Sequence, residues 1–192
     1  MVRDLPAVRA ATAADADAIL AIYGPVVAGT AISFEEQVPT AGQLRQRIAA
    51  RPRLPWLVAG LGPHVVGYAC ATRHRTRPAY RWAADCSAYV AAGHRGTGVG
   101  RLLYERLLAE LRALGYVSAH AGIALPNDAS VALHESLGFR QVGVHRAVGY
   151  KLGAWRDVGT WSLQLVDPLP DPPAEPREWS PAGARLAGPG HG

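Results

Sequence analysis

The sequence has few cysteines, almost no lysine and no long hydrophobic run. Its 192 residues include two cysteines, one methionine and one lysine, Lys151, against 19 arginines. Cys70 and Cys86 stand in separate apolar, strand-like segments without metal-ligand spacing, which excludes a disulfide scaffold and predicts two reduced core residues. No segment approaches the roughly 20 apolar residues of a membrane span. The N-terminal residues lack the apolar stretch of a signal peptide, so we expect a cytoplasmic protein with no membrane partner.

The basic residues are scattered rather than clustered. The net charge is +5, but no Lys/Arg block reaches the five or six residues of a basic tail. No DNA- or RNA-binding module is recognisable in the sequence. We therefore expect no nucleic-acid partner. A site for anionic phosphates accounts for part of the charge more economically.

The chain suits one domain followed by a tail. An apolar share of 49% and five tryptophans provide for a sizeable core, and the length fits a single domain over residues 6–167. Residues 168–192 carry seven of the 15 prolines and no apolar periodicity, which predicts a flexible or extended tail. Deletion after Asp167 is accordingly expected to leave folding nearly intact.

Strand and helix patterns alternate without internal repeats, which indicates an α/β or α+β fold. Thr12 with Asp15 and Thr40 with Gln43 have the spacing of capping boxes at the start of two helices. Leucines at helical spacing predict a third helix over 99–114, ended by Gly115. The expected strands are 8–10, 56–59, 65–72, 85–90, 119–123, 139–144 and 159–165, and a fourth helix spans 128–137.

The most informative local feature is the loop His94-Arg-Gly-Thr-Gly-Val-Gly100, between a strand and an amphipathic helix. Glycine lets the backbone approach a ligand, and the unpaired amides at a helix N-terminus favour an anion such as phosphate. The spacing differs from both the dinucleotide-binding and the ATP-binding glycine motifs. The alternative is that these glycines only form a tight turn.

Two segments carry a family resemblance. Arg95-Gly-Thr-Gly98-Val-Gly100 resembles the Arg/Gln-x-x-Gly-x-Gly/Ala motif of the GNAT N-acetyltransferases, and the segment from Leu125 to Phe139 resembles that family's Asn-x-x-Ser helix with its Gly-Phe ending. Over residues 8–166 the similarity is greatest to phosphinothricin acetyltransferases and related sulfone or sulfoximine acetyltransferases. It implies an α/β (α+β) fold with a mixed, splayed central sheet flanked by helices, acetyl-CoA in the V of the sheet, and a homodimer.

The resemblance also implies how acetyl-CoA is held, with no metal. The backbone of Val90 would meet the pantetheine or the thioester, and the loop would hold the pyrophosphate. Asn127 resembles the asparagine that contacts the cofactor; an N-cap role for it is an alternative compatible with that contact. The implied cofactor-binding residues are Tyr89, Val90, Arg95, Gly96, Thr97, Gly98, Val99, Gly100, Asn127 and Ser130.

Two residues are implied to be catalytic. Asp85 aligns with a glutamate taken to deprotonate the acceptor's ammonium, but its side chain is one methylene shorter, and a polar strand-end role is the alternative. His134 stands where the broader family has a tyrosine acting as general acid toward the thiolate; the alternative is a structural histidine. Asp85, Ser87 and Tyr89 share one strand face by the period of two.

The predicted acceptor is a small, anionic, amino-acid-like primary amine. Arginine suits bidentate binding of a carboxylate or phosphinate, although a solvated arginine loop is the alternative. Two rival functions are acetylation of another amine (a protein N-terminus, a polyamine or an aminoglycoside) and a non-catalytic acyl-CoA sensing module. The candidate acceptor-binding residues are Phe34, Arg75, Arg77, Tyr80 and Tyr89.

Overall fold

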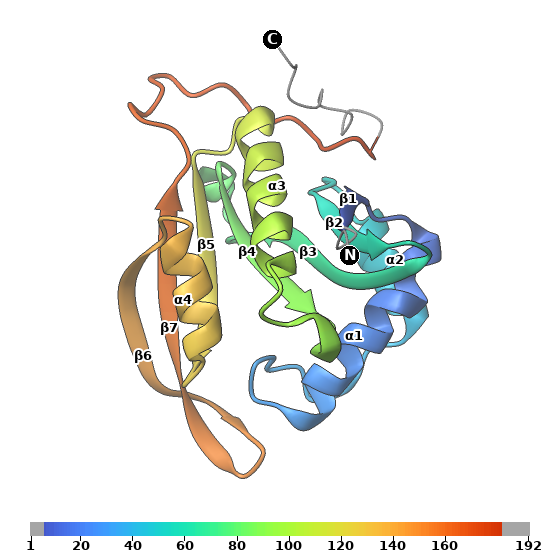
Figure 1. Cartoon of the computed structure of the whole chain (residues 1–192). Coiled ribbons are helices and arrows are strands. Elements are labelled where there is room, and N and C mark those ends of the chain that lie inside the picture. The colour runs from blue at the N-terminus through green and yellow to red at the C-terminus, as the bar shows by residue number, and fades with distance from the viewer. Residues whose placement is uncertain (1–5, 182–192) are drawn as a thin grey trace.

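The computed structural model describes residues 6–181, in which seven strands form one sheet of order β1-β2-β3-β4-β5-β7-β6 (Figure 1). Neighbouring strands are antiparallel except for β4 and β5, which are parallel. This mixed α+β architecture is the predicted fold class. The strands are β1 Ala7–Ala10, β2 Trp56–Leu61, β3 His64–Arg73, β4 Ala83–Val90, β5 Ser118–Leu125, β6 Arg140–Lys151 and β7 Ala154–Gln164.

The sheet is splayed between β4 and β5. These strands pair only from Ala83 opposite Ser118 to Asp85 opposite His120, and the remaining residues of β4 have no partner on β5. Beyond Asp85, β4 is paired with β3 alone, so one edge of its backbone faces the gap. The divergence therefore opens a V in the middle of the sheet (Figure 1).

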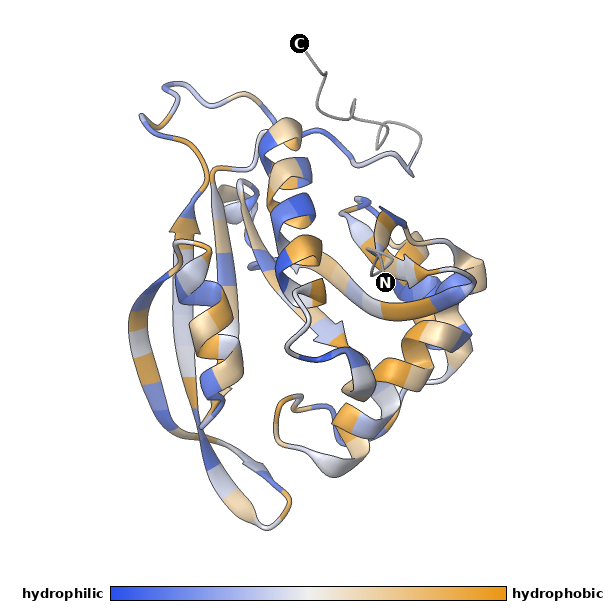
Figure 2. Cartoon of the chain, viewed as in Figure 1, coloured by the Kyte–Doolittle hydropathy of each residue, from blue (hydrophilic) through white to orange (hydrophobic). Residues whose placement is uncertain are grey.

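Helices cover both faces of the sheet. Helices α1 (Ala16–Gly29) and α2 (Ala41–Ala49) pack on one face, around Ile19, Leu44 and Tyr68. Helix α3 (Val99–Leu114) packs on the other through the predicted leucine stripe, and α4 (Asp128–Ser136) lies beside β5 on that same side. Hydrophobic and hydrophilic residues alternate along α3 as a one-sided burial requires (Figure 2).

The helix boundaries follow the local signals in the sequence. Both predicted capping boxes form. Thr12 is the N-cap of a short 3-10 turn (Ala13–Asp15) that leads into α1, and Asp15 is its N3 partner. Thr40 is the N-cap of α2, with Gln43 as its N3 partner. Gly115 ends α3 with φ 91°, in the left-handed region that glycine occupies without strain. No helix within residues 6–181 is long and apolar enough to cross a bilayer.

The β6–β7 hairpin is longer than the sequence pattern predicts. Strand β6 continues to Lys151 and β7 starts at Ala154, whereas only residues 139–144 and 159–165 were expected. Two register shifts, at Gln141/Gly143 and at His145/Gly149, interrupt the alternation of side chains. Most of β6 is exposed, so a buried apolar face does not mark the extension in the sequence.

The described part of the tail, residues 168–181, lies against the domain. Arg177 N donates to Leu114 O, and Trp179 N donates to Arg53 O, at 2.8 and 2.9 Å. The Trp179 side chain is 3% exposed and packs into the larger core cluster, and its Nε1 donates to Glu110. The segment is extended and anchored, and these contacts lead us to expect that its deletion would lower the stability of the domain. Residues 182–192 of the predicted tail lie outside the described residues.

Replacement of Trp179 by alanine tests this anchor. We expect Trp179→Ala to lower the free energy of unfolding by about 3–5 kcal/mol, because a buried indole is removed and leaves a cavity. Guanidinium unfolding followed by circular dichroism measures the change. Leu169→Ala is the matched control in the same tail, since Leu169 is 58% exposed. Equal stability of the two variants would mean that the tail contributes nothing to the fold.

Candidate active site

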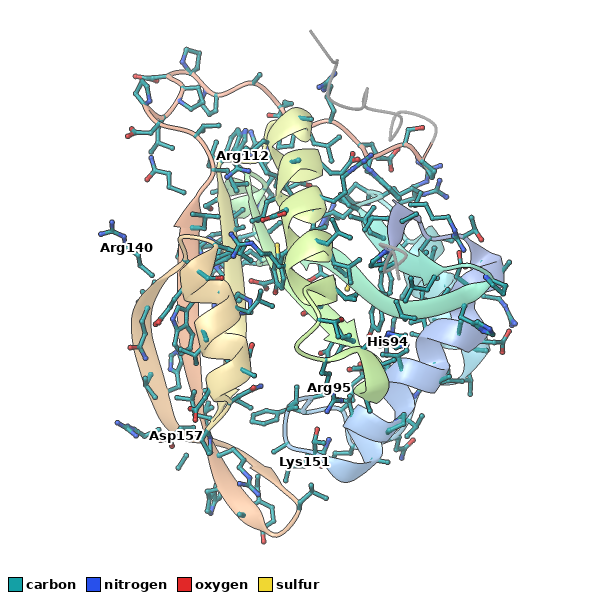
Figure 3. The ribbon with its side chains drawn as sticks, viewed as in Figure 1. His94, Arg95, Arg112, Arg140, Lys151 and Asp157 are labelled. Carbon is teal, nitrogen blue, oxygen red and sulfur yellow. The ribbon has the colours of Figure 1, made fainter. Side chains whose placement is uncertain are left out.

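A cavity of about 420 Å³ lies in the V between β4 and α4, at the N-terminus of α3. It brings together segments that are far apart in the sequence: the end of β4, the glycine loop and the first turns of α3 and α4. His94 and Arg95 mark this end of the molecule in Figure 3. The predicted residues that line it are Tyr89, Val90, Arg95, Gly96, Gly98, Gly100, Asn127, Ser130 and His134.

The glycine loop forms an open cradle at the start of α3. Gly96 and Gly98 have φ values of 72° and 91°, and a Cβ at either would meet nothing within 4 Å. Gly98 is the N-cap, so the unpaired amides of the first helical turn are adjacent to the cavity. Together with the guanidinium groups of Arg95 and Arg101, which also line the cavity, they fit an anionic phosphate.

Two predicted loop residues do not present their side chains to the cavity. Thr97 turns back, and its hydroxyl donates to His94 O at 2.6 Å. Val99 is 3% exposed and packs in the core under the sheet. These positions therefore offer a ligand only their backbone groups.

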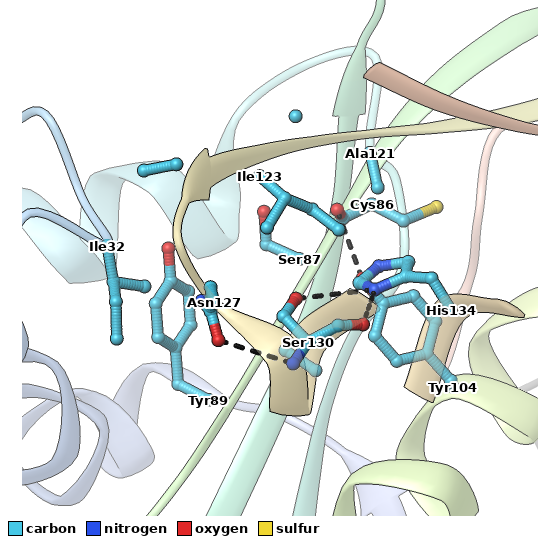
Figure 4. A pocket seen from close by; sticks show the side chains of 13 residues that line it. Ile32, Cys86, Ser87, Tyr89, Tyr104, Ala121, Ile123, Asn127, Ser130 and His134 are labelled. Carbon is cyan, nitrogen blue, oxygen red and sulfur yellow. Dashed lines mark hydrogen bonds between the residues drawn. The ribbon is translucent and has the colours of Figure 1, made fainter. Parts of the chain in front are cut away.

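Helix α4 supplies Asn127, Ser130 and His134 from successive turns. Asn127 Oδ1 accepts a hydrogen bond from Ser130 N at 3.2 Å, so the residue caps α4 and also lines the cavity. His134 is 4% exposed, and its Nδ1 lies 2.7 Å from Ser130 O (Figure 4). Because that carbonyl can only accept, Nδ1 carries a hydrogen. Burial lowers the pKa of His134, and the bond to Ser130 opposes this effect.

Tyr104 of α3 completes this group, although no pattern in the sequence singles it out. Its hydroxyl lies 2.7 Å from His134 Nε2 and 3.3 Å from Cys86 O. Because the hydrogen of neutral His134 is on Nδ1, its Nε2 accepts a hydrogen bond from the Tyr104 hydroxyl. Burial raises the pKa of Tyr104 well above its usual value. Tyr104 falls in the buried stripe of α3, where an aromatic residue is indistinguishable from ordinary core.

A smaller cavity of about 50 Å³, whose lining Figure 4 shows, adjoins the large one. Tyr89, Tyr104, Asn127, Ser130 and His134 line both cavities. On the far side the small cavity reaches Ser87 and Gly122, which lie on the strand faces opposite α3. Together the two cavities extend from the glycine loop to the strand faces opposite α3.

Asp85 lies at the point where β4 and β5 part, outside the lining of both cavities. It shares its strand face with Ser87, two residues further along, which does line the smaller one. Its side chain is 38% exposed, and Oδ1 lies 2.7 Å from His74 Nδ1. The predicted base therefore lies beside the smaller cavity. Its hydrogen bond to His74 was not indicated by the sequence pattern.

Three of the predicted acceptor-binding residues line a different cavity. Arg75, Arg77 and Tyr80 border a space of about 300 Å³ between the loop after β3 and the anchored tail. The structure does not bring them together with the glycine loop. Tyr80 of this cavity is connected to Asp85 through His74. Its ring lies edge-on to the His74 ring, with centroids 6.0 Å apart, and His74 contacts Asp85.

The loop between α1 and α2 forms the opposite wall of the V. Ile32 of this loop lines both central cavities, and Phe34 is 40% exposed beside it. The Phe34 ring packs so closely on Gly149 of the β6–β7 hairpin that a Cβ there would lie 2.1 Å from it. Any larger residue at 149 would displace the ring.

Lys151 of the β6–β7 hairpin binds the end of α1 and the loop between α1 and α2 (Figure 3). Its side chain is buried, and Nζ donates to the carbonyl oxygens of Val27, Ser33 and Glu35 at 2.7, 2.6 and 2.8 Å. These three bonds use all the hydrogens of the ammonium. The only lysine of the chain is therefore a structural clasp between two segments that border the V.

A splayed mixed sheet with a glycine loop at the helix after β4 defines the class of N-acetyltransferases. Within residues 6–181, no group of three or more His, Cys, Asp or Glu side chains could hold a metal ion. Residues 19–139 match the family model described as the acetyltransferase (GNAT) family. The chain belongs to the GNAT acetyltransferase family.

Curated relatives and solved structures agree with this assignment. The chain is 38% identical over 170 residues to a phosphinothricin N-acetyltransferase of Streptomyces viridochromogenes, covering 88% of this chain and 93% of that one. It is 36% identical to an L-methionine sulfoximine/L-methionine sulfone acetyltransferase of Salmonella typhimurium, covering 82% and 94%. A phosphinothricin acetyltransferase from Sinorhizobium meliloti, solved in complex with AcCoA, superposes with TM-score 0.80 at 32% identity, covering 83% of this chain and 88% of that chain.

The left-handed conformation of Gly98 provides a test of the cradle. We expect Gly98→Val to weaken acetyl-CoA binding by at least about tenfold, because a β-branched residue is strained at φ 91° and its side chain would enter the cradle. Isothermal titration calorimetry measures the affinity. Gly93→Ala is the control, since a Cβ at Gly93 meets open space without a positive φ. Unchanged affinity in Gly98→Val would refute this assignment of the loop.

Proposed function

We propose that this enzyme transfers the acetyl group of acetyl-CoA to the α-amine of a small, anionic, amino-acid-like acceptor. The observation that carries the proposal is a pair of adjoining cavities, one at the glycine loop and one that reaches Ser87, two residues from Asp85 on the same strand face. Donor and acceptor can enter these cavities from opposite sides and meet in a ternary complex. Relatives named as phosphinothricin and methionine sulfoximine/sulfone acetyltransferases support this acceptor class.

The donor's phosphates fit the cradle made by Gly96, Gly98 and the first amides of α3, with Arg95 and Arg101 at its rim. The pantetheine would follow the free edge of β4, where residues 86–90 have no partner on β5. When bound, acetyl-CoA supplies an activated acyl group as a thioester. The backbone N–H of Val90 would stabilise the oxyanion that develops at the acyl carbon.

Asp85 would act as the base, directly or through a water molecule. An ammonium has no free lone pair, so it must lose a proton before it attacks the acyl carbon. The side chain is partly exposed beside the smaller cavity, and Oδ1 is held by His74, so Oδ2 is available as an acceptor. A bridging water would compensate for the methylene that aspartate lacks relative to glutamate.

His134 and Tyr104 would return a proton to the departing sulfur as a coupled pair. After the attack, the nitrogen of the tetrahedral intermediate loses its second proton, which would pass through the Tyr104 hydroxyl to Nε2 of neutral His134. Protonated His134 would then donate back to the Tyr104 oxygen as the tyrosine hydroxyl donates to the thiolate, so His134 ends neutral and no tyrosinate remains. Tyr104 lines both central cavities, which places this hydroxyl where the donor and acceptor meet.

The charge beside Asp85 favours an anionic acceptor over a polyamine. The cavity that adjoins His74 through Tyr80 is lined by more arginines than acidic residues. Guanidinium groups there would attract a carboxylate, phosphinate or similar anion and repel a polycation. Its charged lining residues are Arg73, Arg75, Arg77, Arg81, Arg177, Glu175 and Glu178.

A panel of acceptors tests the proposal. Thiol release from acetyl-CoA is measured with L-phosphinothricin, methionine sulfone, methionine sulfoximine, a polyamine and a peptide N-terminus. We expect turnover only with the amino-acid analogues. Turnover with the polyamine or the peptide alone would contradict the acceptor class, whereas acetyl-CoA binding without any turnover would favour an acyl-CoA sensing module.

Substitution of Asp85 tests the base. We expect Asp85→Asn to lower kcat/KM by about 10² to 10⁴-fold while acetyl-CoA still binds, because the amide cannot accept the ammonium proton. The measurement is kcat/KM for the best acceptor across pH 6–9. Asp85→Glu is the companion variant, since it keeps the carboxylate. Full activity of Asp85→Asn at every pH would exclude the role.

We propose that the chain forms a homodimer through the β6–β7 hairpin, which exposes several apolar side chains. Trp155 and Tyr150 are 65% and 58% exposed and pack edge-on against each other. Val142, Val148 and Leu152 are also more than half exposed. Such a concentration of exposed apolar residues is typical of an interface.

Light scattering tests the dimer. We expect a molar mass twice the chain's 20.3 kDa. Trp155→Glu should shift the mass to that of the monomer, because a buried carboxylate in an apolar interface is costly. Leu169→Glu, at an equally exposed site in the tail, should leave the dimer intact. A monomeric wild type would contradict this proposal.

We propose a cytoplasmic location. Cys70 and Cys86 are both buried and unpaired, as predicted, and burial raises the pKa of the Cys70 thiol to about 12. Two inert thiols without a disulfide suit a reducing compartment.

A further inference from the structure

Asp85 occupies the last paired position before the sheet divides. It lies opposite Thr72 of β3 and His120 of β5, and β4 has no partner on β5 beyond it. The backbone of Asp85 is therefore fixed on both sides. Its carboxylate is nevertheless partly exposed, at 38%, and one oxygen has a partner: Oδ1, 2.7 Å from His74 Nδ1.

His74 is held more firmly than the carboxylate that it contacts. Its side chain is 16% exposed, and its ring stacks on that of His120 with centroids 4.2 Å apart and planes 20° apart. Tyr80 packs edge-on against the same ring, and Arg75 donates to the backbone carbonyl of His74 at 3.0 Å. The imidazole is thus confined between a strand and a loop.

The stack does not place two positive rings against each other. Burial lowers the pKa of His120, and the neighbouring His74 lowers it further. His120 Nε2 lies 3.0 Å from Ser118 Oγ, which fixes the orientation of its ring. A neutral, oriented His120 therefore provides a flat surface on which His74 rests.

We propose that His74 is a positioning residue for the base of the acetyl transfer, an inference that rests on the proposed function. An ionised carboxylate only accepts hydrogen bonds, so His74 donates through Nδ1–H to Oδ1. This bond fixes the rotation of the short Asp85 side chain and leaves Oδ2 directed at the acceptor or at a bridging water. Aspartate reaches less far than glutamate, so its orientation matters more.

The proton balance is simple. The acceptor's N–H bond breaks, and its proton passes to Asp85 Oδ2 while the electron pair stays on nitrogen and attacks the acyl carbon. The C–S bond then breaks, the thiolate takes up the second proton that the nitrogen loses, and Asp85 returns its proton to solvent. The hydrogen on His74 Nδ1 remains there throughout, because His74 orients the carboxylate and does not accept the proton. His74 lines neither central cavity, so it does not touch the acetyl-CoA cradle.

Two substitutions separate the hydrogen bond from the ring. His74→Phe keeps the stack but removes the donor, whereas His74→Asn loses the ring but retains an N–H close to the Nδ1 position. We expect His74→Phe to lower kcat by about 10- to 100-fold, the range observed when bonds that orient metal-binding side chains are lost. The KM for acetyl-CoA should stay unchanged, and His74→Asn should recover most of kcat. His64→Phe, at the exposed first residue of β3, is the matched control.

A double variant tests whether His74 acts through Asp85. If His74 acts through Asp85, adding His74→Phe to Asp85→Asn should cause no further loss of kcat. Additive losses, or equal damage from His74→Phe and His74→Asn, would overturn the proposal.

Nitrogen NMR of labelled histidine provides a readout that does not need turnover. We expect His74 to carry its hydrogen on Nδ1 in the wild type and to lose that preference in Asp85→Asn. The opposite tautomer in the wild type would refute the positioning role even if no acceptor of the panel is acetylated. Absence of turnover with the Nδ1–H tautomer intact would instead indicate that the proposed function is wrong.

Discussion

Strands β4 and β5 share only three paired residues each before they separate, and the catalytic architecture depends on this short pairing. A parallel pair buried between helices would normally continue, because unpaired backbone groups away from water are costly. Here the edge of β4 from Cys86 to Val90 is left for a ligand. The same separation makes room for the two adjoining cavities, and it sets Asp85 and His120 at its vertex.

The two arms of the V need support, since β4 and β5 no longer hold each other. On one arm, α3 packs its leucine stripe under β3 and β4. On the other, the long β6–β7 hairpin reaches across to the loop between α1 and α2, where Lys151 binds three carbonyl oxygens and Gly149 admits the ring of Phe34. The buried ammonium is compensated at this place, because it donates to three carbonyl oxygens at the end of α1 and in the loop that follows.

Local signals in the sequence predicted the helices, the glycine loop and an α/β or α+β fold, whereas the splayed sheet was implied by the family resemblance. Capping boxes, a left-handed Gly115 and a leucine stripe act within a few residues, so they can be recognised without the fold. The features that were missed depend on contacts between distant segments: the buried Trp179, the Tyr104–His134 bond and the His74–Asp85 bond. The predicted hairpin was too short because bulges interrupt the alternation of its side chains. That Arg75 and Arg77 line a cavity separate from the glycine loop also depends on distant contacts, with the tail segment, and could not be read from the sequence.

The clasp at Lys151 has a chemical consequence for an enzyme that works with a reactive thioester. Acetyl-CoA acylates exposed lysine ε-amines without a catalyst, provided that the nitrogen has a free lone pair. The single lysine of this chain is buried and shares all its hydrogens with carbonyl oxygens, and every other basic side chain that carries a permanent charge is an arginine, a poor nucleophile. The protein therefore offers its own donor no exposed lysine to acetylate.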